Sequence, residues 1–140
     1  MSGAVVVLVS AVSTSLDDGI AAFNRGEYFD AAELFEKAVA GIDLELKDLA
    51  SALNRIAAAM HLRFERGGRQ ATINLLSQAM LTLDDMKPAK GGIDTERLFD
   101  EIYAFTEEIR AVPRDERSGL KHRARIFLER RRAPKISRAK

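Results

Sequence analysis

The chain contains no cysteine and no tryptophan, and only three of its 140 residues are proline. Without cysteine it can form neither a disulfide bond nor a thiolate metal site, and a reducing compartment suits such a sequence. We therefore expect a cytoplasmic protein. The three prolines, at positions 88, 113 and 134, stand where neighbouring residues also indicate a loop or the end of a helix.

Long hydrophobic runs are also missing. The longest apolar run covers residues 4–9, whereas a membrane-spanning helix needs roughly 17–25 apolar residues. No Lys or Arg precedes this run, and a secretory signal peptide needs positive charge at that place. We expect no transmembrane segment and no signal peptide. Residues 1–14 are interpreted as a helix or a less regular segment that packs on the rest of the chain.

The composition is that of a globular domain, with 46% hydrophobic and 31% charged residues. The net charge of +1 hides an uneven distribution. Residues 114–140 carry eleven basic and three acidic side chains, a net charge of +8, whereas residues 1–113 carry eleven basic and 18 acidic side chains, a net charge of −7. This asymmetry predicts an acidic helical-bundle domain, 1–113, followed by a basic C-terminal helix and tail, 114–140.

Apolar residues recur at spacings of three and four in successive segments, which is the period of an amphipathic helix. The clearest stripe runs from Leu46 to Phe64, and glycines mark the turn before it and the turn after it. The predicted fold class is all-α, an antiparallel bundle of five or six helices joined by short loops. The expected helices cover residues 16–25, 28–42, 46–66, 70–85, 95–112 and 115–132, with a disordered basic end after Pro134.

The first two expected helices carry a pattern of small and large residues at fixed spacings. These residues are Gly19, Gly26, Tyr28, Ala31, Phe35 and Ala38. The pattern resembles a tetratricopeptide repeat, which implies a helix hairpin with small residues where the two helices touch. The pattern recurs less well at Gly67, Arg69, Thr72, Leu76 and Ala79. Its offset of 41 residues differs from the regular 34, so the sequence predicts no tandem array.

A second resemblance covers residues 16–112. Residues 23–36 read F-N-R-G-E-Y-F-D-A-A-E-L-F-E, and this resembles the signature F-N-x-G-x-Y-F-x-A-H-E-x-x-E of a small bacterial and archaeal helical family of unknown function. Ala32 stands where the family has histidine, and Val39 stands where it usually has tryptophan. The resemblance implies a compact helical bundle. A site that used the histidine together with Glu33 would not be intact in this chain.

The sequence predicts no catalytic residue, no metal site and no cofactor. Glu33 and Glu36 lie three residues apart on one expected helix, and His61 lies beside a core position. No H-x-x-x-H or H-E-x-x-H spacing of a zinc site accompanies them. The pairs Gly67-Gly68 and Gly91-Gly92 follow no expected strand, so we interpret them as turns and not as phosphate-binding loops. We interpret the two glutamates as a solvated face and His61 as a half-buried helix residue. The alternative is a small metal-dependent hydrolase built from these three residues.

The basic C-terminal region is the most informative feature for function. Clustered Lys and Arg attract anionic partners with little sequence specificity. We predict a non-enzymatic protein-interaction or scaffold module, acting alone or as a subunit of a larger assembly, whose basic tail docks on an anionic partner. A nucleic-acid or ribonucleoprotein partner, a membrane surface, a solubilising role, and folding against the chain's own acidic body remain as alternatives. The predicted partner-binding residues are Arg123, Arg125, Arg130, Arg131, Arg132, Lys135 and Arg138. The oligomeric state is left open.

Overall fold

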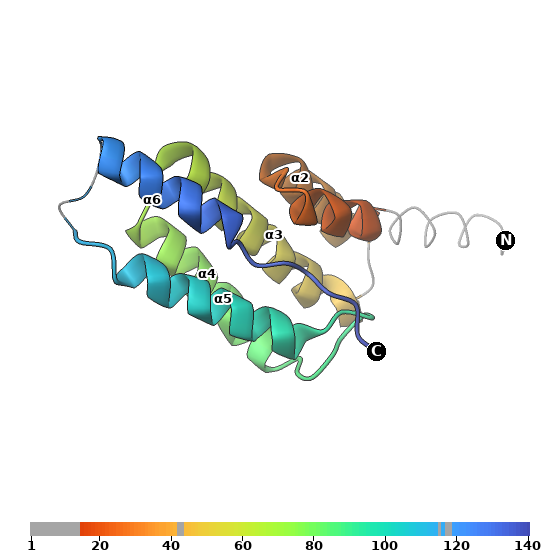
Figure 1. Ribbon diagram of the computed structural model, residues 1–140. Helices are drawn as coiled ribbons and strands as arrows, with labels where there is room; N and C mark the ends of the chain where they lie inside the picture. The colour runs from red at the N-terminus through yellow and green to blue at the C-terminus, as the bar shows by residue number, and fades with distance from the viewer. Residues whose placement is uncertain (1–14, 42–43, 115, 117–118) are drawn as a thin grey trace, which may run out of the picture.

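The computed structural model describes residues 15–41, 44–114, 116 and 119–140, and it is an all-α bundle as predicted (Figure 1). Within these residues the only β contacts are isolated bridges, from Ile93 to Lys90 and to Arg138. The helical elements in chain order are residues 15–24, α2 (Tyr28–Gly41), α3 (Leu44–Arg66), α4 (Gln70–Asp84), α5 (Thr95–Arg110) and α6 (Leu120–Arg131).

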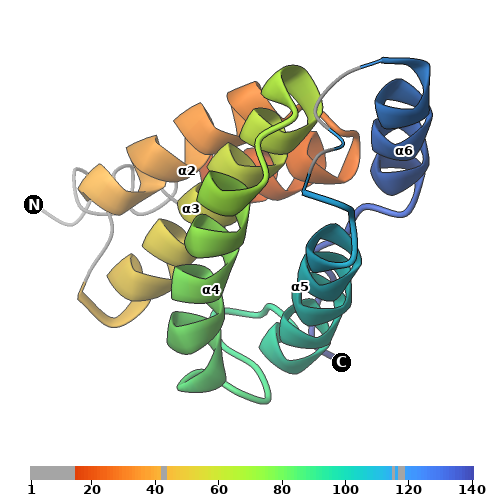
Figure 2. The same cartoon turned by 90° about the vertical axis from the view of Figure 1, so that its left-hand side faces the viewer.

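α3 is the central helix of the bundle. It packs against α2, α4 and α6, and α4 packs in turn against α5. Figure 2 shows α6 at the edge of the molecule. The stripe predicted for α3 is confirmed, because its residues from Leu49 to Met60 include a run of completely buried side chains. No helix in the described ranges is long and apolar enough to cross a bilayer.

Glycine residues and a capping aspartate set the limits of the helices. Gly26 has a φ of 83° and Gly67 a φ of 68°, in the left-handed region that ends a helix at low cost for glycine alone. At the start of α5, the Asp94 side chain accepts a hydrogen bond from the Arg97 backbone N–H at 2.9 Å. This cap satisfies one of the free donors at the helix N-terminus.

The first two helices form the predicted hairpin with small residues at their contact. Ala31 and Ala38 are completely buried. A Cβ atom placed on Gly19 would lie 2.6 Å from Cε1 of Phe35, closer than real side chains approach. The close packing of the hairpin therefore depends on glycine at position 19.

The sixth helix differs in part from the prediction. The sequence places an apolar stripe of Leu120, Ala124, Phe127 and Leu128 on this helix, to hold it against the bundle or against a partner. All four residues are exposed, so they do not pack on the bundle. α6 begins at Leu120 rather than near residue 115, after Gly119 in a positive-φ conformation. Its one buried side chain is that of Glu129, which belongs to a charged pair. This pair, and not an apolar stripe, therefore attaches the helix to the bundle.

The end of the chain is ordered, in contrast to the predicted disorder after Pro134. Residues 132–140 cross the bundle in an extended form (Figure 1). Ala133, Pro134 and Ile136 are buried there. The positive charge of this segment suggested self-repulsion, but three apolar anchors and acidic neighbours on the bundle hold it in place. The expectation for residues 1–14 lies outside the described residues.

Candidate functional site

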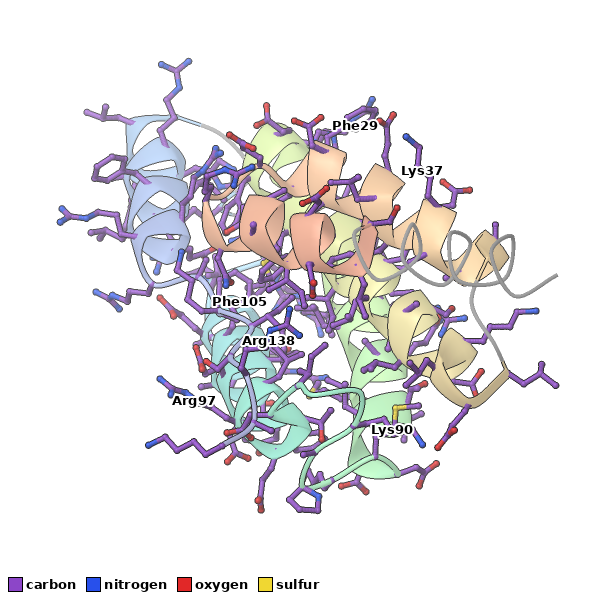
Figure 3. The ribbon with its side chains drawn as sticks, turned by 90° about the vertical axis from the view of Figure 1, so that its right-hand side faces the viewer. Phe29, Lys37, Lys90, Arg97, Phe105 and Arg138 are labelled. Carbon is purple, nitrogen blue, oxygen red and sulfur yellow. The ribbon has the colours of Figure 1, made fainter. Side chains whose placement is uncertain are left out.

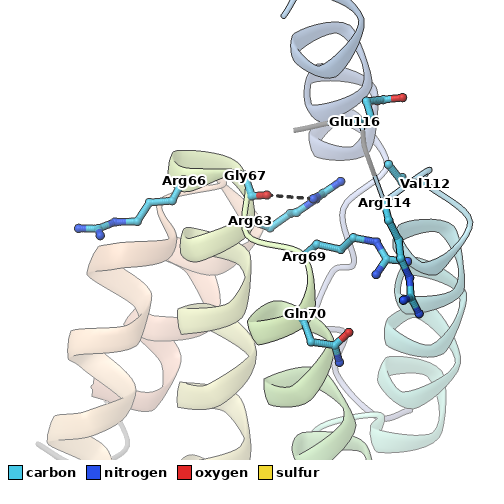
Figure 4. A pocket seen from close by; sticks show the side chains of 8 residues that line it. All are labelled: Arg63, Arg66, Gly67, Arg69, Gln70, Val112, Arg114 and Glu116. Carbon is cyan, nitrogen blue, oxygen red and sulfur yellow. Dashed lines mark hydrogen bonds between the residues drawn. The ribbon is translucent and has the colours of Figure 1, made fainter. Parts of the chain in front are cut away.

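A cavity of about 520 Å³ opens where the turn between α3 and α4 faces the connection from α5 to α6 (Figure 4). Four arginines and one glutamate are among its lining residues, so the lining is strongly positive. A second hollow of about 310 Å³ shares part of this lining and extends between α4 and α5, where Arg110 joins it. The cavity is lined by Arg63, Arg66, Gly67, Arg69, Gln70, Val112, Arg114 and Glu116.

Arg63 forms the inner wall of the cavity and is itself neutralised. Its guanidinium is bound at two points by Glu129 of α6, with Nε–Oε1 at 2.6 Å and Nη2–Oε2 at 2.7 Å. Nη1 donates to the carbonyl oxygens of Gly67 and Gly68 at 3.3 and 3.2 Å. One side chain thus ties together α3, the following turn and α6. This arrangement fixes the shape of the cavity.

The carboxylate that lines the cavity is also paired. Glu116 accepts two hydrogen bonds from the Arg125 guanidinium on α6. These hydrogen bonds hold the pKa of Glu116 below its ordinary value, and they raise the pKa of Arg125. Since Glu116 stays ionised and bound to Arg125, it offers little repulsion to an anion that enters the cavity.

Arg69 is the cavity residue whose surroundings most favour the binding of an anion. It stands at the N-cap of α4, where the helix dipole also favours negative charge. Its Nη2 donates to the carbonyl oxygen of Arg110 at 2.9 Å. Its Nε is buried and has no hydrogen-bond partner among the described residues. A buried donor without an acceptor costs about 1–3 kcal/mol, which an oxyanion of a ligand would recover.

The outer face of α6 is apolar and lies close to these arginines. Leu120 is 84% exposed, Phe127 is 61% exposed and Leu128 is 47% exposed. The guanidinium of Arg131 lies 5.9 Å from the ring centre of Phe127. A hollow of about 480 Å³ separates part of α6 from the end of α3, and Arg66 and Phe127 both line it. We call Leu120, Phe127 and Leu128 the outer α6 face.

Most of the predicted partner-binding residues contact the chain's own bundle. Arg132 pairs with Glu108 at 3.4 Å, and Arg130 pairs with Glu65 at 3.7 Å. Surface ion pairs of this kind contribute about 0–1 kcal/mol, so their cations can exchange partners. The other paired residues are Arg125 with Glu116, Arg138 with Asp17, and Lys135 through its Nζ with the carbonyl oxygen of Asn24.

Arg123 and Arg131 make no ion pair within the described part of the chain, and both are exposed on α6. Sequence reasoning missed Arg66, Arg69 and Arg110, which add positive charge from the bundle itself. The signal for two of them was present, since Arg66 and Arg69 flank the Gly67-Gly68 turn directly.

The residues of the alternative metal site do not come together. Glu33 and Glu36 are exposed on α2, in line with the interpretation of a solvated face. His61 is half-buried on α3, with its ring 5.5 Å from that of Phe29. In the described ranges no three side chains of a metal-binding type form a group.

Comparison of the chain with protein-family models, with curated proteins and with solved structures found no match. The resemblances to the tetratricopeptide repeat and to the small helical family therefore stay predictions, and the function is argued from the site alone.

Proposed function

We propose that this protein is a non-enzymatic protein-interaction module that binds an acidic segment of a partner protein. One observation carries the proposal: α6 exposes Leu120, Phe127 and Leu128 and buries its glutamate. A helix that served only to complete the core would place its apolar side chains against the bundle and its charged side chains in solvent. The outer α6 face is therefore interpreted as half of an interface.

The surroundings of this face indicate the chemistry of the partner. Arg123 and Arg131 flank the apolar residues on α6. Arg66 lines both the hollow beneath α6 and the arginine-lined cavity. Aromatic residues and arginine are the types enriched at interfaces between proteins. An amphipathic segment with carboxylates beside its apolar residues would match both features.

A nucleic-acid partner is the second candidate. The arginines around the cavity favour it, because phosphate contacts alone can supply binding without sequence specificity. The exposed leucines of the outer α6 face do not favour it, since a phosphate backbone offers them no apolar contact. A cytoplasmic location remains part of the proposal and suits a chain without cysteine.

The proposal is tested by capture of partners from a lysate with four forms of the chain. Phe127→Ser removes the aromatic residue of the outer face, and Leu81→Ser is its control, because Leu81 is 74% exposed on α4. Arg66→Gln/Arg69→Gln removes two charges at the cavity. Lys37→Gln/Lys47→Gln removes two charges from exposed positions elsewhere.

We expect a captured protein that survives nuclease and excess heparin, is lost with Phe127→Ser, and is retained with both controls. Its binding should weaken with salt, and less steeply for the cavity variant. Capture that is abolished by nuclease and unaffected by Phe127→Ser would replace the proposal with the nucleic-acid function. Equal capture by all four forms would exclude both.

A further inference from the structure

The C-terminal segment, residues 133–138, follows α6 in the chain. It lies in a groove whose residues come from earlier parts of the sequence. The groove is formed by the helix of residues 15–24, the turn at residues 90–94 and α5. Figure 3 shows the segment beside α5, with Arg138 directed toward the helix of residues 15–24. This segment and groove are independent of the outer α6 face and the arginine-lined cavity.

The groove binds the segment chiefly through its main chain. The Asn24 side-chain amide contacts both backbone groups of Ile136: Nδ2 donates to the Ile136 carbonyl oxygen at 2.9 Å, and Oδ1 accepts from the Ile136 N–H at 2.8 Å. The Asp94 N–H donates to the Ser137 carbonyl oxygen at 2.9 Å, and the Ala139 N–H donates to the Gly92 carbonyl oxygen at 2.9 Å. Such contacts recognise an extended backbone of any chain.

Side chains add a small amount of selectivity. Ile136 is 4% exposed and Ala133 is 7% exposed, so both fill apolar positions in the groove. Arg138 pairs with Asp17, and the Lys135 Nζ donates to the Asn24 carbonyl oxygen at 2.8 Å. The groove thus selects an extended basic segment with an isoleucine two residues before an arginine.

These features are those of a peptide-binding site in which the ligand is tethered. The main-chain clamp at Asn24, the apolar position for Ile136 and the carboxylate of Asp17 require only that such a segment be present. They do not require that it come from the same chain. The tether raises the local concentration of the chain's own segment, which therefore occupies the groove in a single molecule.

We propose that this groove is a peptide-binding site and that it takes the C-terminal segment of a second copy of the chain when its own segment cannot bind. The second copy then contributes residues to a site that is otherwise incomplete. Exchange of an identical element between two copies is a low-cost route to a dimer.

Two full-length variants test this by complementation. Asn24→Leu removes the clamp but keeps the segment, and Ile136→Glu removes the segment's anchor but keeps the groove. Neither variant alone has a groove and a segment that fit, whereas a mixture does. We expect each variant to be monomeric in sedimentation, and the mixture to contain a species of twice the 15.5 kDa of one chain. Circular dichroism checks that each variant is folded, and Ile136→Ala takes the place of Ile136→Glu if that chain is unfolded.

A labelled peptide of residues 133–140 provides the second measurement. It should bind the Ile136→Glu chain, and bind the wild-type chain about tenfold or more weakly because the tethered segment competes. A scrambled peptide of the same charge should bind more weakly, because its isoleucine and arginine no longer fall at the matching positions. No heavier species in the mixture of folded variants, or equal binding of the scrambled peptide, would overturn the proposal.

Discussion

Arg63 on α3 and Glu129 on α6 form a two-point ion pair whose side chains are 1% and 0% exposed. Glu129 is the buried side chain of α6, so this pair is the main internal attachment of the helix. The pair also positions the wall of the arginine-lined cavity. Its loss would therefore affect both stability and the proposed interface.

We predict that Glu129→Ala lowers the free energy of unfolding by about 3–5 kcal/mol, because Arg63 would remain buried without a counter-charge. The double variant Arg63→Met/Glu129→Leu should be more stable than Glu129→Ala, since it leaves no buried charge. Denaturant unfolding measures both. Glu108→Ala is the control: its pair with Arg132 is largely exposed and should be worth less than about 1 kcal/mol.

The buried contact at Ala31 gives a prediction about the helix hairpin. Ala31→Leu should destabilise the protein by about 1–3 kcal/mol, because the added atoms have no space in the packed core. Ala40→Leu places the same side chain on the exposed side of α2 and should change stability by less than about 0.5 kcal/mol. Equal effects of the two substitutions in thermal unfolding would contradict the observed packing.

Gly19 gives a prediction opposite to helix propensity. In an exposed helix interior, Gly→Ala would stabilise by about 1 kcal/mol. At Gly19 the new Cβ would meet the ring of Phe35, which is completely buried. We therefore expect Gly19→Ala to destabilise by about 1–3 kcal/mol. Phe35→Leu should reduce this penalty, and a double-mutant cycle with calorimetry measures the coupling.

The Glu116–Arg125 contact gives a pH dependence. The pKa of Glu116 is lowered in the folded protein by hydrogen bonds from Arg125. A lowered carboxyl pKa adds stability that is present above the unfolded-state pKa and lost as pH falls through the folded-state pKa. Wild type should thus exceed Glu116→Gln in unfolding free energy at neutral pH, and the difference should vanish in acid, below the ordinary glutamate pKa of about 4.3. A difference that persists in acid would show that packing, not charge, is responsible.

Helical periodicity predicted the bundle well because α3 and α5 each bury one continuous apolar stripe. Glycine marked the turns at the ends of helices because the backbone conformation of a residue is a local property. Periodicity also predicted the apolar stripe of α6, but it could not show that the leucines and phenylalanine there face away from the bundle. A buried glutamate cannot be recognised without its arginine, and Arg63 lies 66 residues earlier in the chain.

The candidate site was predicted only in part, for a related reason. The positive charge of the C-terminal region was evident in the sequence, but not the fact that Asp17, Glu65 and Glu108 lie within reach of it. The order of the final segment depends on Asn24, whose side-chain contacts with Ile136 span 112 residues. Such contacts depend on how the helices are placed and have no local signal.

The outward turn of the apolar residues of α6 has a thermal consequence. Detachment of this helix would expose little apolar surface that is not already in water, so its heat-capacity change would be small. The buried stripes of α3 and α5 differ, since their exposure carries a large heat-capacity change and hydrophobic stabilisation weakens on cooling. Cooling should therefore weaken the central bundle while the attachment of α6 changes little. The stability of the core and the attachment of the edge helix would therefore depend differently on temperature.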